Sequence, residues 1–452
     1  MTNNKLVRTV GFWGLVAMCI NAVVGSGVFL LPHESFTLLG AFSLWAPLLF
    51  AIPVFILVLN FAEAATYFDE PGGAYLYAKS AFGDFVGFET GWMNWIARVT
   101  SLASLSNGFV LALALLQPSL GAGAQRAAVI IAATLILAII HYLGVRYGAA
   151  SIYIFTFGKM VPLIGFIIVA LIVWKTNPIP GSFALPGANT NWSDAALFML
   201  FAYAGFENLG VPAGEFKNPR RDLPLALFAG IFAIAATYAL VQLGAMSALP
   251  DLSQSKTPIA SAAAELVGPI GMIVVTIGAL MSMAGTNSGT MLEGSRLLYA
   301  LSLGRRMGPL SYVHPRFRTP SVAIAIHTAV ALGLALGGSF RQLALISAMA
   351  RLTTYLVTCL AVPRLRKLSS SGFLGGARRS VGDNPSEELR GTEEPRGTAP
   401  YRSPGGYLVP VLGVAVSLIF VWNLTPQKLL VAAIALTVGA VLYFVSKPRV
   451  VH

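Results

Sequence analysis

Long apolar segments separated by short polar ones make up most of this chain. A helix needs about 20 apolar residues to cross a bilayer, and such segments recur along nearly the whole sequence. The expected spans cover approximately residues 11–31, 42–62, 84–116, 126–143, 150–174, 192–212, 223–247, 262–298, 321–338, 342–362, 406–424 and 428–446. The pattern predicts an all-α polytopic membrane protein with twelve transmembrane helices.

The composition agrees with that class and orients the helices. Only 11% of the 452 residues are charged, against about 25% in soluble proteins. The net charge of +12 comes from basic residues in alternate loops, which does not indicate nucleic-acid binding. With the N-terminus inside, the outer side holds only Arg126, Lys175, Lys256, Arg341 and Lys428. This bias, roughly four to one, places both termini in the cytoplasm of a cell with a cytoplasmic (inner) membrane.

The longest polar stretch, residues 367–405, contains serine, glycine, proline and glutamate runs and cannot bury a core. We interpret it as a flexible cytoplasmic loop, with residues 406–452 forming the last two spans and a tail. The ten spans before it divide into residues 1–174 and 175–366.

The first apolar segment carries an interruption at residues 23–32, which read VVGSGVFLLP. Glycines inside a helix weaken it, and a break leaves backbone groups unpaired in hydrocarbon at several kcal/mol each. Such a break is tolerated where the freed groups line a polar cavity, which in secondary transporters is the substrate site. The alternative is a helix-packing face of small residues.

The sixth segment carries a second interruption, where Gly205, Glu207, Gly210 and Pro212 break one apolar stretch. Each broken segment is the first helix of a possible five-span unit. Because five is odd, the second unit enters the membrane inverted. Discontinuous helices at matching positions of inverted repeats indicate a binding site, so the two breaks together favour a transporter.

Four sequence segments carry a family resemblance: 25–32 (GSGVFLLP), 71–77 (PGGAYLY) with Glu63 before it, 201–220, and 296–300 (RLLYA). Together they resemble the first, second, sixth and eighth helix motifs of the amino acid–polyamine–organocation transporters. The resemblance runs from about residue 11 to 367. It implies the inverted five-plus-five helix repeat shared with sodium-coupled leucine transporters, with the first and sixth helices broken.

The resemblance also implies a substrate site. The backbone of the first break would hold the α-carboxylate of an amino acid, and the carbonyls of the sixth-helix break would hold its amino group. Phe201 matches an aromatic that closes over substrate in antiporters of the family, and Glu207 matches a gating, proton-responsive carboxylate. The implied substrate-binding residues are Asn21, Gly25, Ser26, Gly27, Arg98, Phe201, Ala202, Ala204 and Gly205.

Lys159 lies inside the fifth span, where a charge is costly and indicates function. In sodium-independent members of the family a lysine at this place stands where a coupling sodium binds, reaching toward the first-helix break and a hydroxyl for which Ser282 is our candidate. We expect Lys159 to act as a fixed charge for exchange or as a titrating group for proton coupling. The alternative is a lysine that extends to the membrane surface.

Other ionisable residues within spans allow several interpretations. Arg98 in the third span could pair with an anionic substrate side chain, pair with Glu207, or bond backbone carbonyls between helices. Arg351 in the tenth span suits a structural or gating role with a carboxylate partner. Glu293 and Arg296, three residues apart on one helix, suit a local ion pair.

These observations predict an amino acid permease that works by alternating access without sodium, through proton coupling or exchange. A polyamine or organic-cation carrier is one alternative, and a membrane amino acid sensor that transports nothing is another. No enzyme motif, nucleotide-binding loop, metal-ligand cluster or cofactor motif stands out. The expected partners are a small-molecule substrate and the lipid bilayer, with the chain as a monomer or homodimer.

Overall fold

The computed structural model describes residues 11–68, 72–172, 190–209, 217–303, 305, 307–370 and 401–446. The described chain is helical and contains no strands. Nine helical segments in these ranges are long and apolar enough to cross a membrane, and four shorter apolar helices accompany them. The predicted all-α polytopic class is therefore confirmed.

The helices occur in the following order. They are α1 (Phe12–Val23), α2 (Gly27–Leu39), α3 (Ala46–Thr66), α4 (Ala74–Phe82), α5 (Asp84–Leu116), α6 (Gly123–Leu143), α7 (Val145–Ile172), α8 (Trp192–Tyr203), η3 (Phe206–Asn208), α9 (Pro219–Ala248), α10 (Pro258–Val267), α11 (Pro269–Ser302), α12 (Ser321–Gly337), α13 (Phe340–Ser370), α15 (Leu408–Trp422) and α16 (Pro426–Val445). Short 3-10 turns lie at Gly40–Leu44, Pro118–Gly121, Leu252–Gln254 and Gly308–Ser311.

Both predicted interruptions are present as breaks between helices. The first expected span is divided into α1 and α2, and the sixth is divided into α8 and η3. Gly210 and Pro212, which the sequence also placed in the second break, lie outside the described residues, as does most of the expected 367–405 loop.

Several expected boundaries differ from those of the helices. The eighth span does not begin at residue 262, because Gly268, with φ of 76°, ends α10 and α11 starts at Pro269. The expected loop does not begin at residue 367, because α13 continues to Ser370. Gly268 adopts a backbone conformation that L side chains rarely take, so one apolar run became two helices.

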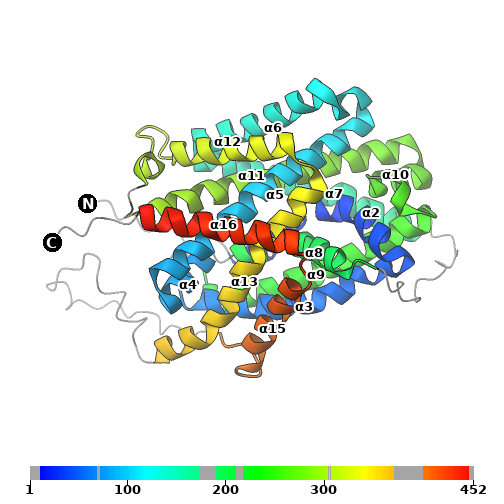
Figure 1. Cartoon of the computed structure of the whole chain (residues 1–452). Helices are drawn as coiled ribbons and strands as arrows, with labels where there is room; N and C mark the ends of the chain where they lie inside the picture. Colours follow the sequence, from blue (N-terminus) through cyan, green and yellow to red (C-terminus); the bar gives the residue numbers. More distant parts are fainter. Residues whose placement is uncertain are drawn as a thin grey trace, which may run out of the picture.

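The helices lie side by side, and α16 ends at the left-hand end of the bundle (Figure 1). Helix α5 is central and packs against α11 and α13, while α2 packs against α8 and α1 against α9. In its most apolar window α5 is 67% buried, whereas α16 is only 11% buried. This contrast places α5 in the core and leaves most of α16 facing the surroundings of the bundle.

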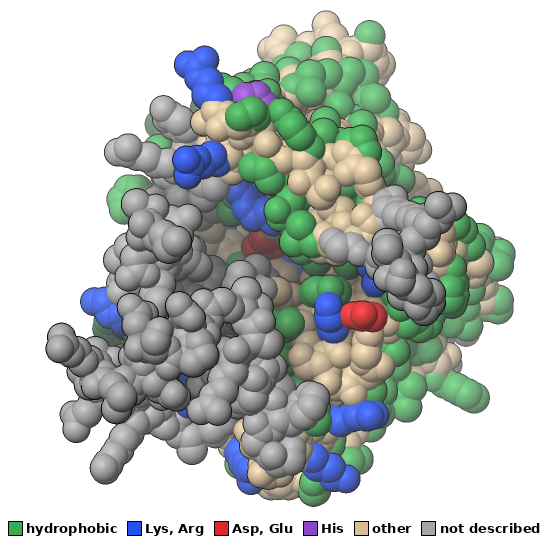
Figure 2. Space-filling model, turned by 90° about the vertical axis from the view of Figure 1, so that its left-hand side faces the viewer, with side chains coloured by type: hydrophobic (Ala, Val, Ile, Leu, Met, Phe, Trp, Pro, Cys, Tyr) green, Lys and Arg blue, Asp and Glu red, His purple; other side chains and the backbone are tan. Residues whose placement is uncertain are grey.

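Figure 2 shows the left-hand end of the bundle of Figure 1, at which α16 ends. Lysine and arginine side chains gather on this face, which is hollowed near its centre, and acidic and basic side chains lie within the hollow. The loop charges of the sequence predict that this face is cytoplasmic.

A buried ion pair fixes the chain just before α15. Arg366 of α13 forks onto Glu63 of α3, with Nε–Oε1 and Nη2–Oε2 distances of 2.6 and 2.7 Å. The backbone N–H and the hydroxyl of Ser403 donate to the same carboxylate at 2.8 and 2.6 Å. The Glu63 side chain is fully buried and that of Arg366 is 9% exposed. Glu63 therefore joins α3, α13 and the chain before α15.

We expect Arg366→Ala to lower the free energy of unfolding by about 3–5 kcal/mol, because it leaves a buried carboxylate without its cation. The measurement is chemical unfolding of the purified protein in detergent. Arg364→Ala is the matched control, since Arg364 is exposed on the same helix and lies over the Phe82 ring at 5.6 Å. Equal stability of the two variants would contradict this role for the pair.

A second charge cluster joins helices at the other end of α13. Arg341 at the start of α13 lies 3.7 Å from Glu34 of α2 and 3.4 Å from Asp194 of α8. Asp194 also pairs with Lys428 at the start of α16. We call these four residues the outer cluster. It holds the far ends of the two interrupted spans against α13 and α16.

Candidate functional site

The first break begins where α1 ends at Val23. Val24 leaves the helical conformation with φ of −73° and ψ of 90°, and Ser26 precedes the first residue of α2, Gly27. The N–H groups of Gly25 and Ser26 donate no hydrogen bond within the described part of the chain. N–H groups in the first turn of a helix also lack intrahelical partners, and the helix dipole makes this end positive. The break thus presents donors suited to an anion.

The carbonyl groups on the other side of this break are already bound. The ammonium of Lys159 on α7 donates to the carbonyls of Asn21 and Val24 at 2.8 and 2.7 Å. The hydroxyl of Ser282 on α11 donates to Val24 and Gly25 at 3.3 and 3.1 Å. Lys159 is fully buried, so it does not extend to the membrane surface. A cation at the C-terminal end of α1 complements the helix dipole.

The second break follows α8. Ala204 is extended, with ψ of 145°, and Gly205 has φ of 129°. A Cβ on Gly205 would lie 2.3 Å from the carbonyl oxygen of Ala22, so only glycine fits where the two breaks meet. Residues 204 and 205 separate α8 from η3, which starts a new turn at Phe206.

Carbonyls of the second break have donors within the protein in this structure. Phe201 accepts from the N–H of Ala204 at 3.2 Å, and Gly205 accepts from the N–H of Asn208 at 3.1 Å. The hydroxyl of Tyr238 on α9 donates to Ala202 at 2.9 Å and to Val23 of the first break at 3.3 Å. Tyr238 therefore links the two breaks directly.

The two interrupted spans are in close contact at their breaks. A Cβ on Gly27 would lie 3.0 Å from Cα of Ala202, which shows how closely α2 approaches α8. A small cavity beside this contact is lined by residues of both spans together with Pro47, Tyr238 and Gln242. The ring of Phe201 is buried and packs edge to face against Phe340 at 6.2 Å. The site is compact in this conformation.

Glu207, in η3, receives four donors. Arg98 Nη2 and Arg351 Nε lie 3.1 and 2.9 Å from its Oε1. The N–H of Gly205 and the hydroxyl of Tyr355 donate to Oε2 at 2.8 and 3.3 Å. Of the three interpretations of Arg98, the pairing with Glu207 is the one found in the structure. Arg351 pairs with the same carboxylate.

Arg98 also binds a second carboxylate. Its Nη1 lies 3.0 Å from Oε2 of Glu293 on α11. The expected local pair of Glu293 with Arg296 was wrong, because Arg296 instead donates to the Leu292 carbonyl at 3.0 Å. The buried Arg98 guanidinium thus has two carboxylates in reach and pairs with both of them. We call Arg98, Glu207, Glu293 and Arg351 the inner cluster, and its formal charge is zero.

Three buried polar atoms close to the first break have no hydrogen-bond partner in the described chain: Asn21 Oδ1, Ser26 Oγ and Thr286 Oγ1. A Cβ on Gly25 would lie 3.2 Å from Thr286 Oγ1, so the α11 hydroxyl faces the break. Because buried polar groups are normally hydrogen-bonded, three unbonded atoms at one place indicate a site for a polar ligand.

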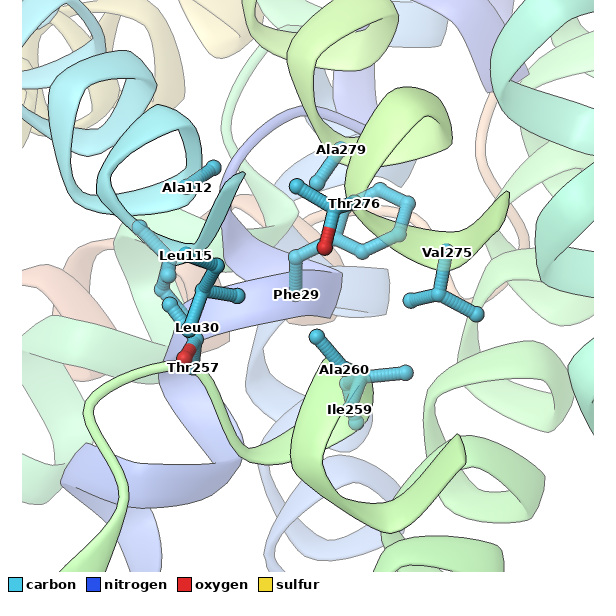
Figure 3. A pocket seen from close by; sticks show the side chains of 10 residues that line it. All are labelled: Phe29, Leu30, Ala112, Leu115, Thr257, Ile259, Ala260, Val275, Thr276 and Ala279. Atoms are coloured by element: carbon cyan, nitrogen blue, oxygen red, sulfur yellow. The ribbon is translucent and has the colours of Figure 1, made fainter. Parts of the chain in front are cut away.

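Another pocket lies away from the breaks, between α2, α5, α10 and α11 (Figure 3). Its lining is apolar except for Thr257 and Thr276. No charged group lines it, so it does not suit a zwitterion.

The sequence analysis did not predict three residues that lie at the site. Tyr238 and Tyr355 carry no mark in an apolar segment that separates them from ordinary membrane tyrosines. Thr286 lies four residues after Ser282 and therefore on the same face of α11, a spacing that offered a usable signal.

Two interrupted helices that meet inside a bundle of membrane-spanning helices are typical of secondary transporters. The amino acid permease family model matches residues 10–446 of this chain. The chain belongs to that family, whose members are transporters and not enzymes, and it is accordingly an amino acid transporter.

Curated relatives agree with this membership. The chain is 30% identical over 374 residues to the serine/threonine exchanger SteT of Bacillus subtilis, covering 81% of this chain and 85% of the relative. It is 26% identical over 397 residues to the uncharacterized transporter Rv1979c of Mycobacterium tuberculosis, covering 81% and 82%. It is 25% identical over 361 residues to the b(0,+)-type amino acid transporter 1 of Mus musculus, covering 76% and 73%.

Proposed function

We propose that this protein exchanges small neutral amino acids across the cytoplasmic membrane by alternating access, without sodium. The observation that carries the proposal is the Lys159 ammonium, which occupies the carbonyls of Asn21 and Val24 beside the unpaired N–H groups of Gly25 and Ser26. A protein-borne cation in this place makes a bound metal cation unnecessary.

The substrate in this proposal is a zwitterion held between the two breaks. The N–H groups of Gly25, Ser26 and Gly27, with Asn21, bind its carboxylate. Carbonyls of the second break bind its ammonium once Tyr238 and the local N–H donors release them. The substrate-binding residues at that break are Phe201, Ala202, Ala204 and Gly205. Opposed half-helices offer donors to one end of an amino acid and acceptors to the other.

A neutral side chain suits the remaining surroundings. Arg98 and Glu207 neutralise each other, so neither offers an uncompensated charge to a substrate. The free hydroxyls of Ser26 and Thr286 can bond a short polar side chain. The similarity to a serine/threonine exchanger supports the same substrate class and an exchange mode.

For alternating access we propose two inverted units, residues 1–174 and 175–366, with residues 406–452 at the periphery. The outer cluster holds α2 and α8 together at one end, and the hollow with the basic rim opens at the other (Figure 2). In this proposal both termini are cytoplasmic, and the conformation is a state closed toward the outside.

The test uses purified protein in liposomes without sodium. We expect uptake of labelled serine or threonine only into vesicles loaded with unlabelled amino acid. Uptake into empty vesicles driven by an inward proton gradient would show that the protein is a proton symporter and not an exchanger. Transport of polyamines in place of amino acids, or binding with no transport, would overturn the proposal.

A substitution at Thr286 tests the substrate class. We expect Thr286→Val, which keeps the shape and removes the hydroxyl, to weaken serine transport about fivefold relative to alanine transport, because one hydrogen bond contributes about 1 kcal/mol. The measurement is competition by unlabelled serine and alanine against one labelled substrate. Thr437→Val on peripheral α16 is the control, and an unchanged serine-to-alanine ratio would exclude Thr286 from the pocket.

A further inference from the structure

The inner cluster has one member that differs from the other three. The side chains of Glu207, Arg351 and Arg98 are 0%, 3% and 5% exposed, whereas the side chain of Glu293 is 30% exposed. Glu293 lies nine residues before the end of α11, which is about 14 Å along the helix from Ser302. The charge cluster at the core therefore has one carboxylate within reach of water.

The two carboxylates also differ in how firmly their charge is held. Glu207 accepts from two guanidinium groups, a backbone N–H and a phenol. Glu293 accepts only from Arg98 within the described residues. A proton on Glu207 would displace several charge-assisted bonds, while a proton on Glu293 displaces one. Of the two, Glu293 is the group that a proton reaches and can bind.

We propose that Glu293 is the proton-responsive carboxylate of this transporter, acting on the substrate site through Arg98. This inference rests on the proposed transport function. A proton from water on the side of the hollow adds to a carboxylate oxygen of Glu293 and no other bond is made or broken, apart from the Arg98 contact that weakens.

Arg98 carries the effect because its two terminal nitrogens bind the two carboxylates separately, Nη1 to Glu293 and Nη2 to Glu207. Protonation of Glu293 changes the formal charge of the inner cluster from zero to +1. Arg98 then has Glu207 as its remaining carboxylate, and Glu207 is bonded to the N–H of Gly205 in the second break. A proton at Glu293 thus moves Arg98. It also makes the electrostatic potential more positive at the second break, where the substrate ammonium would bind.

Charged and titratable groups from four elements surround Glu293. Arg98 comes from α5, Glu207 from η3 and Arg351 from α13, while Arg296 on α11 itself is directed to the Leu292 carbonyl. Each of two nearby histidines has one ring nitrogen bonded, while His327 Nε2 and His141 Nδ1 have no partner in the described part of the chain. His327 of α12 accepts from Trp95 at 3.1 Å, and His141 of α6 bonds Ser288 at 2.8 Å.

The first experiment measures amino acid exchange in oriented liposomes while the pH on the side of the hollow is varied from about pH 5 to about pH 8. We expect the wild-type rate to change at least about fivefold, the lower end of typical coupling between sites. Glu293→Gln keeps the shape of the protonated acid and is expected to exchange at a rate that varies less than about twofold. Glu265→Gln, an exposed carboxylate on α10, is expected to keep the wild-type profile.

The second experiment needs no transport. A hydrophobic carbodiimide reacts with protonated carboxyl groups, and mass spectrometry identifies the labelled peptide. We expect labelling of Glu293 that falls as pH rises, and none at Glu207.

The outcomes separate the inference from the proposed function. Labelling of Glu293 without any amino acid transport would remove the function and leave the proton site. A wild-type pH profile in Glu293→Gln, a wild-type rate independent of pH, or the absence of label at Glu293 would each overturn the inference.

Discussion

Replacement of Lys159 by alanine is expected to abolish transport, with an exchange rate at least about a hundredfold below wild type, equivalent to about 2.7 kcal/mol. The variant removes the only cation bonded to the carbonyls of Asn21 and Val24 among the described residues. The Asn21 carbonyl would then be unpaired at membrane depth, at several kcal/mol, and the Val24 carbonyl would keep only the Ser282 hydroxyl at 3.3 Å. The first break would close into a helix or move away from α11.

The measurement is the initial rate of serine exchange in liposomes at several pH values, with protein amounts matched after purification. Lys79→Ala is the control, because Lys79 is half-exposed on α4 and pairs with Asp84 at 3.1 Å. A Lys159→Ala protein that transports normally at all pH values would show that the ammonium has no role in coupling. Elution of the Lys159→Ala protein as a single species in detergent would show that the variant is folded, so that a loss of transport is not a loss of folding.

Replacement of Glu207 by alanine is expected to lower the free energy of unfolding by about 3–5 kcal/mol and to abolish exchange. Arg351 would lose its only carboxylate among the described residues, and Arg98 would keep Glu293 alone. The N–H of Gly205 would lose its acceptor as well. The second break therefore depends on this carboxylate for its shape.

Unfolding in detergent and exchange in liposomes measure the two effects. Glu207→Gln retains an oxygen for Gly205 and removes only the charge, so we expect an intermediate loss of stability. The double variant Glu207→Ala with Arg351→Met removes the uncompensated charge, and we expect it to recover part of the lost stability. A Glu207→Ala protein as stable as wild type would mean that the guanidinium groups find other partners.

Features that a single segment encodes could be predicted from the sequence. The apolar run at residues 84–116 coincides with α5, because Gly83 and Pro118 bound it and mark its ends in the sequence. The breaks after Val23 and Tyr203 were visible because a broken helix in a membrane needs glycine and polar residues at the break itself. The boundary at Gly268 was missed because apolar residues continue on both sides of it.

Features that join distant segments came only with the tertiary structure. Arg98 and Glu207 are 109 residues apart, and three interpretations of Arg98 were equally consistent with its own segment. Glu293 and Arg296 had a spacing suited to a local pair, yet Arg98 from another helix provided a closer partner for Glu293. Tyr238 joins the two breaks across separations of 215 and 36 residues.

The sequence by itself determined the class of this protein, its interrupted helices and the position of Lys159 within a span, because each follows from the local cost of polar groups in lipid. The tertiary structure decided which carboxylate each arginine binds, which carbonyls Lys159 occupies and which hydroxyls remain unbonded. The physical reason is that a buried charge takes whichever partner the packing of other helices brings within about 3 Å, and the spacing along one helix does not contain that information.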